Sequence, residues 1–156
     1  MKTLHISVPL QEGYLVEDNR LIWTFPISTS RFGLGTEEGS NRTPLGQFRV
    51  CEKYGGRASN GTIFKGRKAV GEWNPEKETD EDLVLTRILR LESTAAGLEN
   101  TYLRYIYFHG TNQESLIGTP SSHGCIRLSN QNSMKLYSLI PVGTLVNIRD
   151  EKLTLP

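Results

Sequence analysis

Alternation of apolar and polar residues dominates the first quarter of the chain. Leu4, Ile6 and Val8 alternate with polar neighbours, and the run LIWTFPI that follows is rich in strand-forming residues. A period of two residues is typical of half-buried β-strands. The segments QEG and EDN between these runs resemble tight turns. We therefore predict three strands joined by short connections, near 3–8, 13–17 and 20–27.

Shorter apolar runs predict the remaining strands. Alternation returns at 47–53, and the aromatic and β-branched run RYIYFHG predicts a strand over 104–110. The run LVLTRILRL at 83–91 fits either a helix or a buried strand, and the surrounding β pattern favours a strand. A last strand is predicted at 144–149.

One short helix is predicted near the carboxyl end. Ser129 or Asn130 can cap its start, and Pro141 with Gly143 ends it. The fold class is therefore mainly β, with one helix following the loop at 109–129. Two other segments are loops: 28–48 is rich in Gly, Ser and Thr, and 62–82 resists assignment around a charged surface excursion, WNPEKETDED.

Length and charge narrow the class of protein. The chain has 156 residues, enough for one hydrophobic core, and we predict a single domain over 1–156. Lys plus Arg is 18 and Asp plus Glu is 17, so the formal net charge is +1. Such a balance gives no long-range attraction to a phosphate backbone or an anionic bilayer. We expect neither nucleic acid nor membrane as a partner.

The two cysteines and the amino-terminal residues bear on the compartment. Cys51 and Cys125 lie in different surroundings, unlike the dense pattern of a disulfide scaffold, so both are expected to be free thiols. The first residues show no export signal, because polar residues and Pro9 interrupt the apolar run. We expect a cytoplasmic protein, or a periplasmic one if a signal peptide has been removed.

The loop HGTNQESLIGTPSSHGCIRLS carries the main chemical signal. It holds His109, His123 and Cys125 among several glycines. A thiol becomes a nucleophile when a neighbouring imidazole takes its proton. His109 ends a strand 16 residues before Cys125, so the loop can fold back and bring the two side chains together. We predict Cys125 as nucleophile and His109 as general base, paired as thiolate and imidazolium.

Neighbouring residues complete the predicted site. The amides of His123, Gly124 and Cys125, expected just ahead of the helix, can form an oxyanion hole. His123 also shapes the loop and contacts substrate. His109 needs an orienting partner, for which Asn112 and the carbonyl of Gly110 are the candidates.

An arginine near the nucleophile adds a clue to the substrate. Arg127 lies two residues after Cys125, and its guanidinium can bind a carboxylate of substrate or protein. An acidic substrate is therefore indicated.

Less specific interpretations stand beside this one. Cys51, between Val50 and Glu52, is most simply an inert thiol. A zinc site from His109, His123 and Cys125 is an alternative, although the paired ligand spacing of zinc sites is missing. We expect no metal and no cofactor.

Motifs along almost the whole chain resemble one family. HGT at 109–111, Gly118 and SHGCIRL at 122–128 are similar to the signature of the L,D-transpeptidase catalytic domain, the YkuD family. The opening strands and TPLGQF at 43–48 resemble it too. The resemblance implies a β-sandwich in which Cys125 attacks peptidoglycan stem peptides.

The same resemblance implies roles for the residues around the nucleophile. His109 is the general base and Gly110 supplies the carbonyl that orients its ring. Ser122, His123 and Arg127 match pocket-lining positions, and Thr111 and Asn112 join them as candidate substrate contacts.

The implied reaction cuts a tetrapeptide stem between meso-diaminopimelate and terminal D-Ala through a thioester. Water as acceptor makes an L,D-carboxypeptidase, which we favour because the chain resembles a small cytoplasmic subgroup of muropeptide-recycling enzymes. An amine acceptor instead makes a 3-3 cross-link. The strained lactam of a carbapenem is expected to acylate Cys125. An alternative of another class is a non-catalytic β-sandwich that binds wall fragments or zinc.

Overall fold

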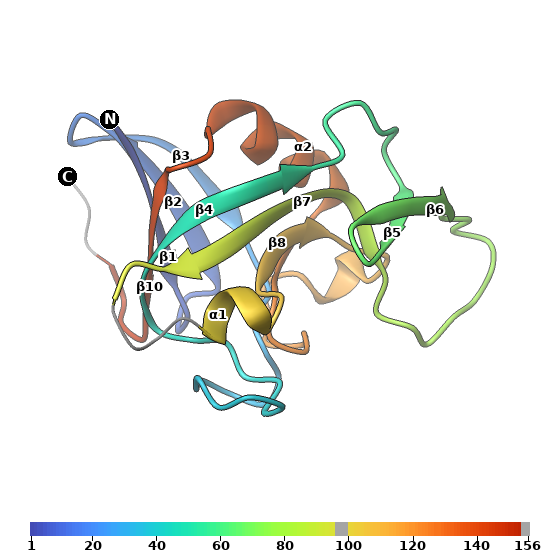
Figure 1. Cartoon of the computed structure of the whole chain (residues 1–156), viewed down its shortest axis with the longest axis horizontal. Helices are drawn as coiled ribbons and strands as arrows, with labels where there is room; N and C mark the ends of the chain where they lie inside the picture. Colours follow the sequence, from blue (N-terminus) through green and yellow to red (C-terminus); the bar gives the residue numbers. More distant parts are fainter. Residues whose placement is uncertain (96–99, 154–156) are drawn as a thin grey trace.

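The computed structural model describes residues 1–95 and 100–153. Its strands form one hydrogen-bonded sheet with the central order β3-β2-β1-β10-β4-β7-β5-β6 (Figure 1). Off this path, β8 pairs with β7, and β9 pairs with β8. The mainly β class predicted from the sequence is confirmed. The strands are β1 (Lys2–Ser7), β2 (Glu12–Glu17), β3 (Arg20–Pro26), β4 (Gly46–Tyr54), β5 (Thr62–Lys65), β6 (Lys68–Glu72), β7 (Val84–Ser93), β8 (Tyr107–Gly110), β9 (Ile126–Leu128) and β10 (Leu145–Arg149).

The helical segments are short. They are α1 (Asn100–Leu103), the 3-10 turn η1 (Glu114–Leu116) and α2 (Asn130–Leu139). Ser129 caps α2 as predicted, because its hydroxyl accepts from the amide of Asn132 at 3.1 Å. None of the described helices has the length and apolar character needed to span a bilayer.

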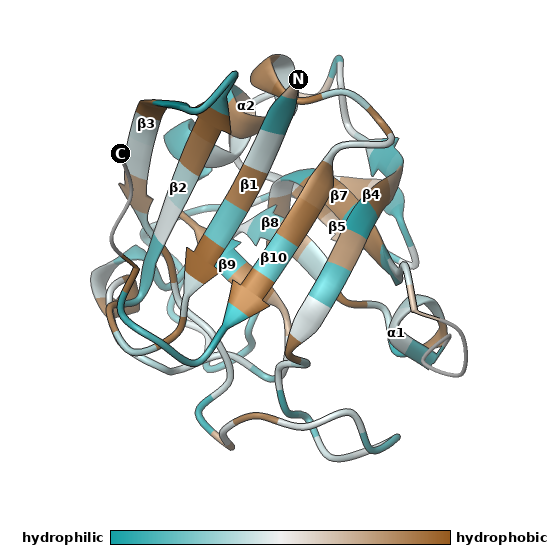
Figure 2. Cartoon of the chain, turned by 90° about the vertical axis from the view of Figure 1, so that its left-hand side faces the viewer, coloured by the Kyte–Doolittle hydropathy of each residue, from teal (hydrophilic) through white to brown (hydrophobic). Residues whose placement is uncertain are grey.

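The core lies between the two halves of the curved sheet. Bands of apolar residues alternate with polar ones along β1, β2 and β10 (Figure 2). Their inward side chains, Leu4, Ile6 and Ile148 among them, join one buried cluster with Phe108 of β8 and Ile126 of β9. This cluster fixes β8 and β9, the two strands that flank the candidate site.

The first and last strands pair in parallel in the middle of the sheet. β1 has the hairpin partner β2 on one side and β10 on the other, with Thr3 opposite Leu145 and Ser7 opposite Arg149. Parallel neighbours need a crossover, and here almost the whole chain forms it. The sheet is therefore complete only when both ends of the chain are in place.

Three sequence expectations need correction. The strand predicted over 104–110 begins only at Tyr107, because α1 and a turn with Tyr105 at φ 57° come before it. The unassigned segment 62–82 contains the hairpin of β5 and β6, which pairs with β7 through β5. The segment 109–129, predicted as a loop, contains η1 and β9, so the amides of residues 123–125 lie ahead of β9 and not directly ahead of α2.

Candidate active site

Parallel pairing of β8 and β9 positions the two predicted catalytic residues. Phe108 pairs with Ile126 and His109 with Arg127, so Cys125 lies beside Tyr107, whose amide donates to Sγ at 3.4 Å. Cys125 directly precedes β9 and lies two residues before Arg127, the partner of His109. By ideal sheet spacing, the Cα atoms of Cys125 and His109 are separated by about 4.8 Å across the strands and about 6.6 Å along them.

The imidazole of His109 is buried and held from behind. It is 2% exposed, and its Nδ1 lies 2.6 Å from the carbonyl oxygen of Gly110. This contact occupies Nδ1 and leaves Nε2 as the ring nitrogen that can exchange a proton. Of the two orienting partners considered, Asn112 is engaged elsewhere: its amide oxygen accepts from Leu83 and its nitrogen donates to the carbonyl of Glu81.

The thiol of Cys125 is held in its neutral form. It donates to the carbonyl of Tyr105 at 3.3 Å, and its sulfur packs against the small cluster of Phe64, Ile88 and Tyr107. Burial raises the pKa of Cys125 to about 12, and burial lowers the pKa of His109. Both shifts disfavour the predicted thiolate and imidazolium in the resting protein.

Backbone geometry at the motif leaves two amides unpaired. Gly124 has φ 122°, a conformation that side-chain-bearing residues rarely adopt. Its amide donates to the hydroxyl of Ser122 at 3.3 Å, whereas the amides of His123 and Cys125 have no hydrogen-bond partner in the described part of the chain. These two N–H groups are the oxyanion-hole candidates that remain available to a substrate.

The loop 28–48 supports this backbone turn. The hydroxyl of Thr43 donates to the carbonyl of Gly124 at 2.9 Å and accepts from the amide of Ser30 at 3.0 Å. Thr43 and Ser30 are both buried. Thr43, in the Thr-Pro motif, therefore supports the backbone next to Cys125 from a segment that is distant in sequence.

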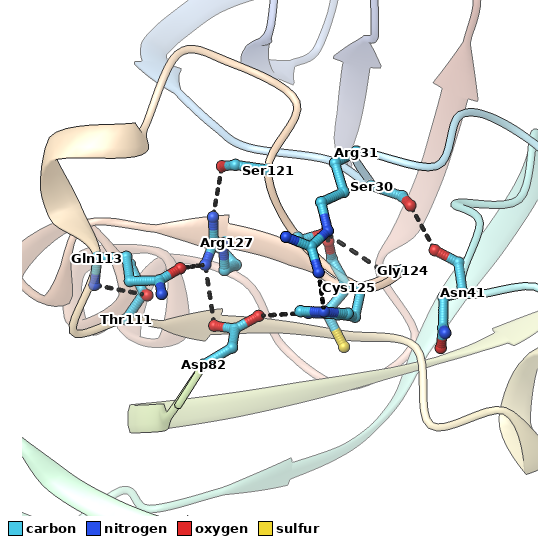
Figure 3. A network of polar contacts seen from close by, with 12 residues as sticks. Ser30, Arg31, Asn41, Asp82, Thr111, Gln113, Ser121, Gly124, Cys125 and Arg127 are labelled. Atoms are coloured by element: carbon cyan, nitrogen blue, oxygen red, sulfur yellow. Dashed lines mark hydrogen bonds and ion pairs between the residues drawn. The ribbon is translucent and has the colours of Figure 1, made fainter. Parts of the chain in front are cut away.

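Arg127 is an internal anchor. Its side chain is fully buried and donates to Asp82 at 2.9 Å, to Gln113 at 2.6 Å and to Ser121 (Figure 3). The sequence predicted that Arg127 binds a carboxylate of either the substrate or the protein. In the structure it binds a carboxylate of the protein, that of Asp82. The Arg127 guanidinium therefore links the segment before β7, through Asp82, to the loop between β8 and β9, through Gln113 and Ser121.

Other predicted substrate contacts also point inward. Ser122 is buried and its hydroxyl donates to the carbonyl of Cys125 at 2.6 Å, while the hydroxyl of buried Thr111 accepts from the amide of Gln113. This placement supports structural roles for Ser122, Thr111, Asn112 and Arg127 and gives no support to direct contact with substrate. His123 differs, because its side chain is 45% exposed.

Asp82 is the residue that sequence reasoning missed. Its carboxylate contacts Nδ1 of His123 at 3.2 Å as well as Arg127, and Arg31 reaches Nε2 of His123 at 2.9 Å. With Nδ1–H donating to Asp82 and Nε2 accepting from Arg31, one neutral tautomer of His123 satisfies both neighbours. Asp82 belongs to the acidic run ETDED, and nothing in that run indicates that this carboxylate is the one that binds Arg127.

The described residues contain no group of three His, Cys, Asp or Glu side chains arranged to hold a metal ion. The zinc alternative from His109, His123 and Cys125 therefore has no geometric support there. Around β8 and β9 the described residues place a thiol, a buried imidazole and two open amides.

Known proteins share this arrangement of strands and motif. Residues 2–148 match the family model of YkuD, the L,D-transpeptidase catalytic domain. The chain is 45% identical over 56 residues to the probable L,D-transpeptidase YbiS of Escherichia coli, covering 35% of this chain and 18% of that one. It is 49% identical over 43 residues to the putative L,D-transpeptidase YqjB of Bacillus subtilis, covering 28% and 24%.

A solved structure agrees at the level of the fold. L,D-transpeptidase 3 from Mycobacterium tuberculosis, in complex with a faropenem-derived adduct, superposes with a TM-score of 0.61 at 17% identity. The match covers 95% of this chain and 60% of that one. The matched segments of the two relatives above span less than a quarter of those proteins. Because the family model spans nearly all of the sequence, the chain belongs to the YkuD family of L,D-transpeptidase catalytic domains.

Proposed function

We propose that the protein is a cysteine-dependent acyl-transfer enzyme acting on peptidoglycan stem peptides. The observation that supports this most is the register of β8 and β9, which brings Cys125 to within two residues of the partner of His109, with the ring of His109 held by the Gly110 carbonyl. The scissile bond is the one between the L-centre of residue 3 of the stem, meso-diaminopimelate, and terminal D-Ala.

The reaction starts from the neutral pair. Nε2 of His109 takes the thiol proton as Sγ of Cys125 attacks the carbonyl carbon, and the amides of Cys125 and His123 receive the developing oxyanion. Collapse expels D-Ala, whose amine takes the proton from the imidazolium, and leaves a thioester. An acceptor then attacks the thioester with His109 again acting as base, which restores the thiol.

We propose water as that acceptor, which makes the protein an L,D-carboxypeptidase of muropeptide recycling in the cytoplasm. This choice rests on the resemblance to small enzymes of that kind. Formation of 3-3 cross-links is the second candidate, favoured by relatives named as L,D-transpeptidases.

Release of D-Ala from a disaccharide tetrapeptide tests the proposal. The wild-type chain should release D-Ala and the Cys125→Ala variant should not, while Cys51→Ala, which removes the other thiol, should keep wild-type turnover. Unchanged release by Cys125→Ala would refute the cysteine mechanism. No release by the wild-type chain would leave the wall-fragment binder as the better description.

The same assay with an added amine separates the two acceptors. Water as acceptor predicts free tripeptide at every amine concentration, whereas a cross-linking enzyme gives an amide product that grows with amine. Intact mass after incubation with a carbapenem gives an independent check. One adduct should appear on wild type and Cys51→Ala and be absent from Cys125→Ala, by analogy with the faropenem-derived adduct of the mycobacterial enzyme.

A further inference from the structure

A cavity of about 670 Å³ lies beside α2. Its walls are the end of β4 and the turn after it, one residue of β7, and one side of α2. Figure 1 shows α2 beside the end of β4 and the connection that leads to β5. The proposed mechanism uses none of the residues that line this cavity.

The lining is strongly one-sided in charge. Lys53, Arg87 and Lys135 contribute three cations, and no carboxylate lines the cavity. In the described part of the chain, none of the three forms an ion pair. A pocket of this size with three positive charges and no negative one attracts anions.

Arg87 is the most informative of the three cations. It is only 7% exposed, and its Nη1 donates to the carbonyls of Ala58 at 2.8 Å and Thr86 at 2.7 Å. Its Nη2 and Nε make no hydrogen bond within the described residues, and neither is closed off from solvent. Two donors of a fixed guanidinium therefore remain open on the cavity wall.

Lys53 is held in a similar way. Its Nζ donates to the carbonyls of Tyr137 at 2.6 Å and Ile140 at 2.9 Å, at the carboxyl end of α2, which leaves one N–H. Both cations lie over the ring of Tyr137, whose centroid is 4.0 Å from Nζ of Lys53 and 5.5 Å from the guanidinium carbon of Arg87. The aromatic ring holds both charges on one wall.

These contacts have two interpretations, a purely structural role for the cations and a site for an anion. Charge balance decides between them. Backbone carbonyls satisfy hydrogen bonds but cannot neutralise a cation, and buried charges are normally paired with an opposite charge. Burial lowers the pKa of Lys53 and of Arg87, which reflects that missing compensation. Helix capping by Lys53 explains its position but not the gathering of three unpaired cations around one cavity.

We propose that this cavity is a binding site for a phosphoryl anion. The open nitrogens of Arg87 and the remaining N–H of Lys53 supply donors, and the ammonium of Lys135, 4.5 Å from the centroid of the Trp23 ring, adds positive charge at the rim. Such a set suits the several oxygens of a phosphoryl group better than a flat carboxylate. Gly56 lets the turn after β4 pack closely against Tyr137, because a Cβ there would lie 2.8 Å from the hydroxyl of Tyr137. The phosphoryl group is either that of a soluble phosphate ester or that of a lipid headgroup.

Calorimetric titration of the whole chain tests the site. Inorganic phosphate and pyrophosphate are titrated at constant ionic strength against a sodium chloride blank. We expect saturable binding with one site per chain, tighter for pyrophosphate. Heat that grows without saturation, or that matches the chloride blank, would overturn the proposal.

Variants then locate the bound anion. Arg87→Gln should weaken pyrophosphate binding about tenfold or more, and Lys135→Gln, at an exposed position, about threefold. The control Lys68→Gln, on exposed β6, should bind as wild type. If Arg87→Gln does not fold, Lys135→Gln still decides the matter. Wild-type affinity in a folded Arg87→Gln or in Lys135→Gln would contradict the proposed site.

Two further arms distinguish the sources of the phosphoryl group. N-acetylglucosamine 1-phosphate represents a soluble ester, and vesicles of phosphatidylglycerol, with phosphatidylcholine as blank, represent a headgroup. Competition with pyrophosphate by the sugar phosphate alone identifies a soluble ligand. Competition by phosphatidylglycerol vesicles alone identifies a lipid, and failure of both to displace bound pyrophosphate would overturn the assignment to a phosphate ester or a headgroup.

Discussion

At the scale of the residue, burial raises the pKa of Cys125 and lowers the pKa of His109. Burial disfavours charge, so the thiol of Cys125 keeps its proton and the imidazole of His109 stays neutral. The neutral imidazole is the form that accepts a proton. The reaction therefore needs no preformed ion pair, and proton transfer accompanies attack.

The pH dependence of kcat/KM follows from these shifts. The base is active when deprotonated, and its pKa lies below the ordinary 6.5, so the acid limb should have its midpoint below pH 6.5. The thiol remains protonated until its pKa near 12, so no loss from thiol ionisation is expected up to pH 9. D-Ala release measured from pH 4.5 to pH 9 checks this. A midpoint above 6.5 would contradict a buried neutral base.

At the scale of the element, Asp82 fastens the segment before β7 to the cysteine loop. The Asp82→Asn substitution removes the counter-charge of fully buried Arg127 and should lower the free energy of unfolding by about 3 kcal/mol. For a chain of this size that corresponds to a fall in Tm of roughly 6–12 °C. Thermal unfolding followed by circular dichroism measures it.

The neighbouring carboxylate provides the matched control for this substitution. Glu81 is exposed and forms no ion pair within the described residues, so Glu81→Gln should leave Tm within about 2 °C of wild type. Equal shifts for the two variants would show that the Asp82 contacts are not specific.

Thr86 supports the base from the opposite side of β8. It is fully buried with φ 74°, and its hydroxyl accepts from Gly61 and donates to Asn130 at 2.7 Å. The amide nitrogen of Asn130 in turn donates to the carbonyl of Thr111. This chain of contacts fixes the backbone whose Gly110 carbonyl orients His109.

Two substitutions at Thr86 distinguish the contribution of its hydroxyl to stability from the contribution of its packing. Thr86→Val leaves buried polar groups unpaired and should cost about 1–3 kcal/mol in the free energy of unfolding, with a lower kcat. Thr86→Ser keeps the hydroxyl and should cost under about 1 kcal/mol. Urea unfolding and D-Ala release measure both effects. Equal losses for the two variants would assign the role to packing alone.

Sequence pattern and structure agree where a local signal exists. Alternation found β1, β2, β3, β4 and β10 within one or two residues, and Ser129 marked the start of α2. The need of an imidazole for an orienting partner left Asn112 and the Gly110 carbonyl as candidates, and the family resemblance pointed to Gly110, which the structure shows in contact with His109. These features depend on periodicity, capping or the needs of one functional group.

Features that depend on distant contacts were not predictable. The run RYIYFHG reads as one strand, yet Arg90 of β7 contacts the ring and carbonyl of Tyr102 and favours a helical turn there. Asp82 and Thr43 gain their roles only when remote loops meet the cysteine. Gly110 is required because a Cβ there would lie 2.3 Å from the side chain of Asn130.

At the scale of the whole molecule, closure of the sheet rests on β10. Its apolar residues Val146 and Ile148 are buried between β1 and β4. A chain that ends at Gly143 lacks this strand and exposes two sheet edges, so it should show no cooperative unfolding transition. The exposed substitution Val142→Ser is the control and should unfold cooperatively near the wild-type Tm. Urea titrations followed by fluorescence distinguish the two, and a sharp transition in the shortened chain would contradict this role for β10.

The parallel pairing of β1 with β10 also governs the order of events during synthesis. The strand β1 leaves the ribosome with its hairpin partner β2, but its other edge has nothing to bind until β10 emerges. Until then that edge is an open template for other nascent chains. Completion of the fold must therefore follow synthesis of β10, and a holdase that masks the hairpin of β1 and β2 would raise the yield of native protein.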